Sequence, residues 1–225
     1  MSSVAGTPSA REYHVPDVLR HPLLYGDWHP LLRDPIDLIR LTYLIGALVA
    51  ISLGDVEGGA RLGATALFVY IARVINVPRP FDLGFTLAMG LQGWGNVFGL
   101  FDSLSWWDTL VHCVLSLFAA PLFYIGLARL NVVPDLSEAM RHHAVGIFVV
   151  TLSLGLAFGA CYEIYEWVVD NVFGGNLHIG ETDTVSDLTM DALGSAVGGA
   201  LLTVWARYGW RTIRRVPAER VESHP

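Results

Sequence analysis

The chain has 225 residues, of which 53% are hydrophobic and only 16% are charged, whereas about 25% of residues are charged in an ordinary soluble domain. Its net charge of −7 combines 21 acidic residues with 14 arginines and no lysine, and this balance does not suggest a nucleic-acid partner. The apolar residues form long blocks, which is typical of a polytopic membrane protein.

Residues 1–35 are polar, contain prolines and histidines, and carry the near-repeat HPLLYGD at 21–27 and HPLLRDP at 29–35. Their leucine pairs and aromatic residues favour a cytoplasmic segment that lies at the headgroup level. We expect this N-terminal segment to precede a transmembrane domain at 36–208. An arginine-rich cytoplasmic tail is expected at 209–225.

Six apolar segments follow in the transmembrane domain, and each can supply the roughly 20 residues that cross the hydrocarbon core. The first can do so only if Asp37 and Arg40 lie at the headgroups. Glycines are frequent in the third, fifth and sixth segments, where small residues let helices approach closely. The sequence thus predicts an all-α bundle of about six transmembrane helices at 36–54, 59–78, 82–101, 105–130, 141–170 and 185–208.

Arginines alternate between the loops and set the expected orientation. They lie before or within the start of the first segment, at the junction of the second and third, around the loop between the fourth and fifth, and in the tail. The other three loops are acidic, with Arg61 as the sole nearby base. By the positive-inside rule, both termini are expected in the cytoplasm.

This orientation places a set of acids and one histidine on the extracytoplasmic side. Ionised side chains at membrane depth cost several kcal/mol, about 2.5–3.5 on insertion scales, and therefore indicate a functional site. The fourth and sixth segments start on this side and the fifth ends there. The residues that they bring are Asp108, His112, Glu163, Glu166, Asp170, Asp183, Asp187 and Asp191.

Helix capping is an alternative explanation for some of these acids. Ser105–Asp108 and Thr184–Asp187 both match the capping-box pattern. His112 and Asp191 each lie four residues further on, one turn deeper on the same helix face. Glu163 and Glu166 lie near the C-terminal end of the fifth segment, where the helix dipole disfavours anions, so they need a compensating partner.

Carboxylates and a histidine on facing helices are how helix bundles build divalent-metal sites. Oxygen ligands suit Mg, Mn or Ca, whereas imidazole also admits Zn or Fe, so the identity of the metal stays open. We expect a divalent metal at the extracytoplasmic side, with Glu163 or Glu166 as a ligand or catalytic base. The predicted metal ligands are Asp108, His112, Glu163, Glu166, Asp187 and Asp191.

Four stretches resemble the YjdF-like family of bacterial integral membrane proteins: VPRPFDLGFTLAMG at 77–90, WWDTLVH at 106–112, YEIYEW at 162–167 and DTVSDLTMDALGSAVGG at 183–199. They resemble the VanZ-like family more distantly, and Trp167 departs from its pattern, which tends to have Gln there. The resemblance implies a multi-pass protein of a bacterial plasma membrane. The YjdF-like family has no established activity, and VanZ-like proteins are associated with glycopeptide resistance.

The leading functional hypothesis is metal-assisted hydrolysis or transfer of a lipid or lipid-linked envelope substrate. A proton-coupled transporter is an alternative, and it needs a polar path for which Gln92, Asn96 and Arg73 are the candidates. A non-catalytic assembly factor, whose acids hold a partner or a cation, is a third reading. The lipid bilayer is the expected environment in all three.

Overall fold

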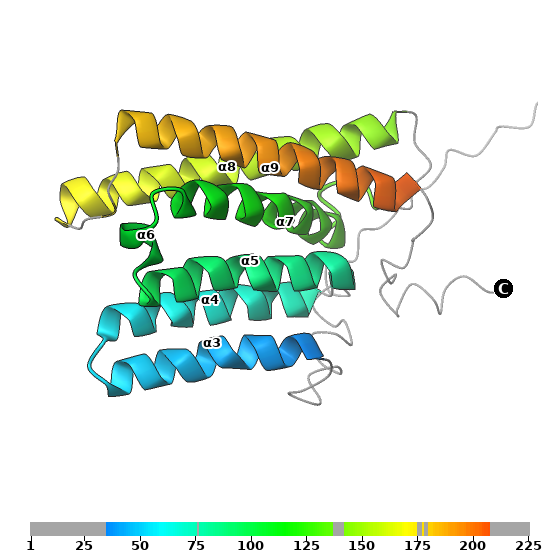
Figure 1. The fold of residues 1–225 in the computed structure, drawn as a ribbon. Coiled ribbons are helices and arrows are strands. Elements are labelled where there is room, and N and C mark those ends of the chain that lie inside the picture. The colour runs from blue at the N-terminus through cyan, green and yellow to red at the C-terminus, as the bar shows by residue number, and fades with distance from the viewer. Residues whose placement is uncertain (1–34, 76, 137–141, 175–176, 178–179, 208–225) are drawn as a thin grey trace, which may run out of the picture.

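The computed structural model describes residues 35–75, 77–136, 142–174, 177 and 180–207 (Figure 1). The predicted tail at 209–225 and, apart from Pro35, the predicted segment at 1–35 with its near-repeat lie outside the described residues. The helices are α3 (Pro35–Ser52), α4 (Val56–Ile75), α5 (Arg79–Val97), α6 (Leu100–Ser103), α7 (Trp107–Arg129), α8 (His143–Val172) and α9 (Glu181–Arg207).

The described residues form an all-helical bundle without strands, which confirms the predicted fold class. Five of the described helices, namely α3, α4, α7, α8 and α9, are long and apolar enough to cross a membrane. The 19-residue α5 is not among these five, although it runs alongside its neighbours in Figure 1. Its glycines, Asp82, Gln92 and Asn96 lower its hydropathy.

Two local expectations about helix ends are wrong. Gly99 adopts the left-handed conformation, with a φ of 64°, so the predicted third segment breaks into α5 and the four-residue α6. Because α9 begins at Glu181, upstream of Thr184, Asp187 lies beyond the cap. The N-cap of α7 is Trp106, and no side chain caps that end. Neither predicted capping box is formed.

Close packing at glycines joins α7, α8 and α9, and this confirms the predicted packing faces. A Cβ on Gly194 of α9 would lie 2.1 Å from the backbone oxygen of Cys113 in α7. One on Gly155 of α8 would lie 1.8 Å from Ser195 Oγ in α9. Helices α3, α4 and α5 pack on one another, and contacts of α7 with α5 and, to a smaller extent, with α4 join the two groups.

The chain passes back and forth so that the ends alternate along the bundle (Figure 1). The helix ends that carry Arg40, Arg73, Arg129 and Arg207 therefore lie at one end of the bundle. The start of α3 and the end of α9 also lie there, so the described chain begins and finishes at the same end. That this end faces the cytoplasm stays a prediction.

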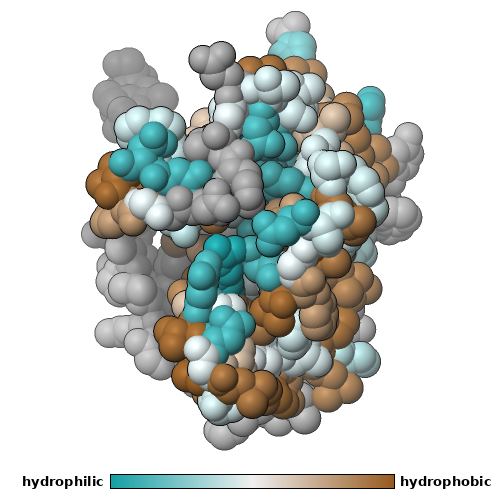
Figure 2. Space-filling view, turned by 60° about the vertical axis from the view of Figure 1, so that its left-hand side comes forward, coloured by the Kyte–Doolittle hydropathy of each residue, from teal (hydrophilic) through white to brown (hydrophobic). Residues whose placement is uncertain are grey.

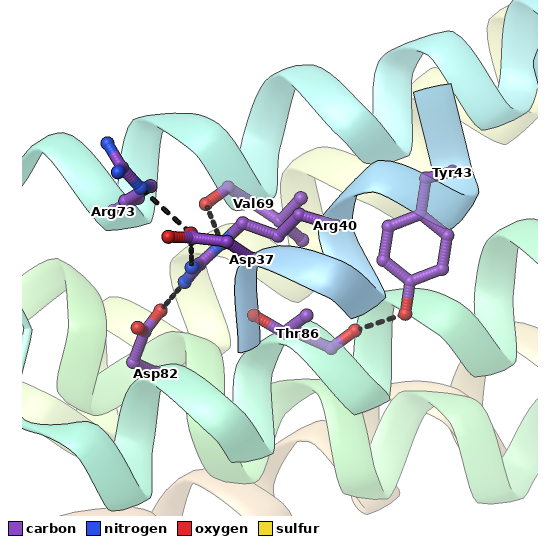
Figure 3. Close-up of polar contacts among 7 residues, drawn as sticks. All are labelled: Asp37, Arg40, Tyr43, Val69, Arg73, Asp82 and Thr86. Carbon is purple, nitrogen blue, oxygen red and sulfur yellow. Dashed lines mark hydrogen bonds and ion pairs between the residues drawn. The ribbon is translucent and has the colours of Figure 1, made fainter. Parts of the chain in front are cut away.

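A buried ion-pair cluster holds α3, α4 and α5 together near this end (Figure 3). Arg40 donates to Asp37 Oδ1 at 2.6 Å and also pairs with Asp82, while Arg73 Nε lies 2.8 Å from Asp37 Oδ1. Asp37 and Arg40 are each only 1% exposed. These two side chains must lie at headgroup depth if the first segment is to span the membrane, which stays a prediction; the structure adds that the bundle encloses them.

Candidate metal centre

The opposite end of the bundle brings together the six predicted ligands. Helix α7 supplies Asp108 and His112 from its first turns, α8 supplies its glutamates from its last turns, and α9 supplies its aspartates near its start. All are buried except Asp108, whose side chain is 29% exposed. The predicted convergence of Asp108, His112, Glu163, Glu166, Asp187 and Asp191 is therefore present in the structure.

His112 lies at the centre of this cluster, and its two ring nitrogens face different partners. Nδ1 lies 3.2 Å from Asp191 Oδ2. Asp191 is fixed in turn by the Ser116 hydroxyl, which donates to Oδ1 at 2.5 Å. Nε2 faces Asp108 Oδ1 at 3.7 Å and Glu163 Oε1 at 3.9 Å. A carboxylate that accepts from one imidazole nitrogen leaves the other free to bind a metal.

Two groups of side chains have ligand atoms within 4.8 Å of one another, and both include His112. The first group joins His112 to Asp108 and Asp187, and the second joins it to Glu163 and Glu166. Either arrangement could hold a metal ion. Asp191, predicted as a ligand, belongs to neither group, and its contacts suit a residue that orients His112 instead.

Several carboxylate oxygens in the cluster lack hydrogen bonds. Within the part of the chain that the structure describes, both oxygens of Glu163 and both oxygens of Asp187 are buried without one. Glu163 is 5% exposed and Asp187 is 1% exposed. A buried carboxylate without a hydrogen bond is strongly unfavourable, so these groups call for added positive charge, either as a cation or as protons.

Tyr162 and Gln92 extend the site from α8 and α5. The Gln92 amide donates to the Tyr162 hydroxyl at 2.8 Å, and the Tyr162 ring meets the His112 ring edge-on with centroids 5.7 Å apart. With His112, Ser116 and Asp191, these residues line a cavity of about 10 Å³. That is room for one water molecule.

A larger hollow of about 470 Å³ adjoins the cluster, and Asp108, Glu166 and Tyr162 are on its wall. Figure 2 shows hydrophilic side chains gathered across this part of the surface, with hydrophobic side chains flanking them. The site is therefore open to ligands larger than an ion.

The remaining acids of the region have other positions. Asp170 accepts a hydrogen bond from the Leu177 backbone N–H at 2.6 Å, so it shapes the loop after α8. Neither Asp170 nor Asp183 belongs to either ligand group.

Ser116 was not predicted from the sequence, although it lies one turn beyond His112 on the same face of α7.

The fold and this cluster define a class: a polytopic helical membrane protein with a buried group of carboxylates around one histidine. A family model described as "Predicted membrane protein (DUF2238)" matches residues 42–208, about three quarters of the chain. The chain belongs to this family, which is the YjdF-like family, and the resemblance seen in the sequence is confirmed. The VanZ-like resemblance receives no support. No curated protein and no solved structure matches the chain.

Proposed function

We propose that the protein binds a divalent cation between α7, α8 and α9 and uses it to hydrolyse or transfer a lipid or lipid-linked envelope substrate. The setting is the extracytoplasmic side of a bacterial plasma membrane. The proposal is supported mainly by the two ligand groups around His112, in which Glu163 and Asp187 are buried without hydrogen bonds from the described residues. Five carboxylates surround one imidazole there, and a cation offsets this excess.

The side chains take different roles in this proposal. His112 is a ligand through Nε2, because Nδ1 faces Asp191. Asp108, Asp187 and Glu163 are candidate ligands, and Asp191 with Ser116 sets the orientation of the imidazole. Glu163 is the candidate general base where it does not bind the ion, and Glu166, which belongs to the same ligand group and also lines the larger hollow, can contact a substrate there. A bound ion would polarise a phosphoryl or carbonyl oxygen or activate water.

The test is the metal content of the full chain purified in detergent, measured by inductively coupled plasma mass spectrometry after dialysis against Mg, Mn, Ca and Zn. We expect a stoichiometric ion in the wild type and its loss in the double variant His112→Ala/Glu163→Ala. Asp170→Asn is the matched control, since it removes an acid from the end of the same helix but outside both ligand groups. A folded wild-type protein that takes up none of these ions would overturn the proposal.

Proton-coupled transport is the second candidate, because buried carboxylates without hydrogen bonds can hold protons in place of a metal. The three residues predicted for its path are poorly placed for one. Gln92 donates to Tyr162 and Asn96 accepts from Arg61 at the acidic end, whereas Arg73 pairs with Asp37 near the opposite end. Proton flux in liposomes with an imposed pH gradient, compared between wild type and Glu163→Gln, separates this candidate from the first.

A further inference from the structure

The hollow beside the metal centre is built from five elements of the bundle. It lies between the start of α4, the end of α5, α6, the start of α7 and the end of α8. Its volume of about 470 Å³ is far larger than an ion needs and is within the range of small-molecule sites. Its charged lining residues are Asp55, Glu57, Arg61, Asp102, Asp108 and Glu166.

The charge of this lining selects the kind of ligand. Five carboxylates and one guanidinium line the hollow, so a divalent ion at the adjoining centre would leave it negative. The guanidinium of Arg61 already donates to Glu57 and Asn96. A ligand with only a phosphate would therefore meet net repulsion, whereas a ligand with an ammonium group would be attracted.

Two further features of the wall suit an ammonium group. Glu166 is 94% buried as a residue, lines the hollow, and receives no hydrogen bond or ion pair from the described residues. Its carboxylate is therefore available to a ligand. The aromatic rings of Tyr162 and Phe101 are also on the wall, and aromatic faces attract ammonium cations.

We propose that this hollow binds the ammonium-bearing headgroup of a zwitterionic phospholipid, whose phosphate then lies toward the metal centre. The inference rests on the proposed function, because it names the substrate class for the same site. The ammonium group lies among the carboxylates of the hollow and the tyrosine ring. Lipids with an uncharged alcohol in place of the amine lack this attraction and are selected against.

The experiment compares dihexanoyl-phosphatidylethanolamine with dihexanoyl-phosphatidylglycerol, which has the same chains but no amine. Binding to the full chain in detergent is measured by isothermal titration calorimetry, once with the metal and once with chelator. Soluble phosphoethanolamine is a third arm that separates headgroup recognition from recognition of a lipid. We expect the ethanolamine lipid to bind at least about tenfold more tightly than the glycerol lipid.

The double variant Glu57→Gln/Asp102→Asn removes two charges from the hollow and leaves both ligand groups intact. It should reduce the affinity for the ethanolamine lipid about tenfold, since two partly exposed charge interactions are lost. Its metal content should equal that of the wild type. Asp135→Asn, which removes one charge outside the hollow, is the control. Should the double variant not fold, Asp102→Asn on the exposed α6 gives the same test with a smaller effect.

Equal binding of the two lipids, or tighter binding of the glycerol lipid, would overturn the inference. Unchanged affinity in a folded variant would do the same, because the carboxylates would then not recognise the amine. A wild-type protein that binds no metal would instead count against the proposed function. Preference for the amine in the presence of chelator would still support the inference about the hollow.

Discussion

Adding one methyl group at Gly159 should disable the proposed metal centre without removing any charged group. A Cβ at this position of α8 would lie 2.0 Å from Asp191 Oδ2 and 2.6 Å from its Cγ. No side chain tolerates such contacts, so Gly159→Ala must displace Asp191 or push α8 away from α9. Asp191 is the residue that faces His112 Nδ1, and its displacement frees the imidazole to rotate.

Two effects of different size follow from this geometry. Overpacking at a close helix contact costs about 1–3 kcal/mol of stability. Loss of the carboxylate that orients a metal-binding histidine typically lowers metal affinity about 10–100-fold. We therefore expect Gly159→Ala to fold with a lower thermal midpoint and to bind the ion at least about tenfold more weakly, as measured by titration of the metal-free protein.

Two alanine substitutions in the same helix serve as controls. Gly146→Ala adds a methyl where nothing lies within 4 Å, so stability and metal affinity should both be kept. Gly155→Ala would place its Cβ 1.8 Å from Ser195 Oγ, one turn away from the metal centre, so it should cost stability without a tenfold loss of affinity. If Gly159→Ala binds the ion like the wild type, or Gly155→Ala weakens binding equally, the orienting role of Asp191 is refuted.

Three further predictions concern the fold and its orientation. Arg40→Leu removes the buried guanidinium shared by Asp37 and Asp82, so the free energy of unfolding in detergent should fall by about 3–5 kcal/mol. Partial rescue by adding Asp82→Asn would separate lost pairing from a simple packing defect. Gly194→Ala would place its Cβ 2.1 Å from the Cys113 backbone oxygen, and because a backbone yields little we expect a loss of at least about 1–3 kcal/mol, seen as a lower thermal midpoint. Epitope tags at both termini should be inaccessible to antibody in intact cells and accessible after permeabilisation; detection of either tag on intact cells would invert the predicted orientation.

The helices were predictable from the sequence because long apolar blocks are the strongest signal that a membrane protein carries. Alternation of those blocks also predicted that Glu163, from the end of one segment, would meet Asp108 and Asp187 from the starts of two others. The role of Asp191 was not predictable, because it depends on which imidazole nitrogen the carboxylate reaches. The capping box predicted at Thr184 is wrong, because α9 begins further upstream at Glu181.

The ion-pair cluster near the other end was missed for a related reason. The sequence shows Asp37 and Arg40 at helical spacing, but their partners Arg73 and Asp82 come from α4 and α5, and no local pattern links them. The sequence of α3 alone therefore gives the two charges no partners in the other helices. Tertiary contacts enclose them in the bundle interior, where each charge meets an opposite one.

The two polar regions of the bundle, the ion-pair cluster of α3, α4 and α5 and the carboxylate cluster around His112, differ in how their charges are compensated. In the first, Asp37 and Asp82 are matched by Arg40 and Arg73, so the helices carry their own neutralisation. In the second, five carboxylates surround the single imidazole of His112. The first region therefore needs no ligand, whereas the second calls for added positive charge, either as a bound cation or as protons.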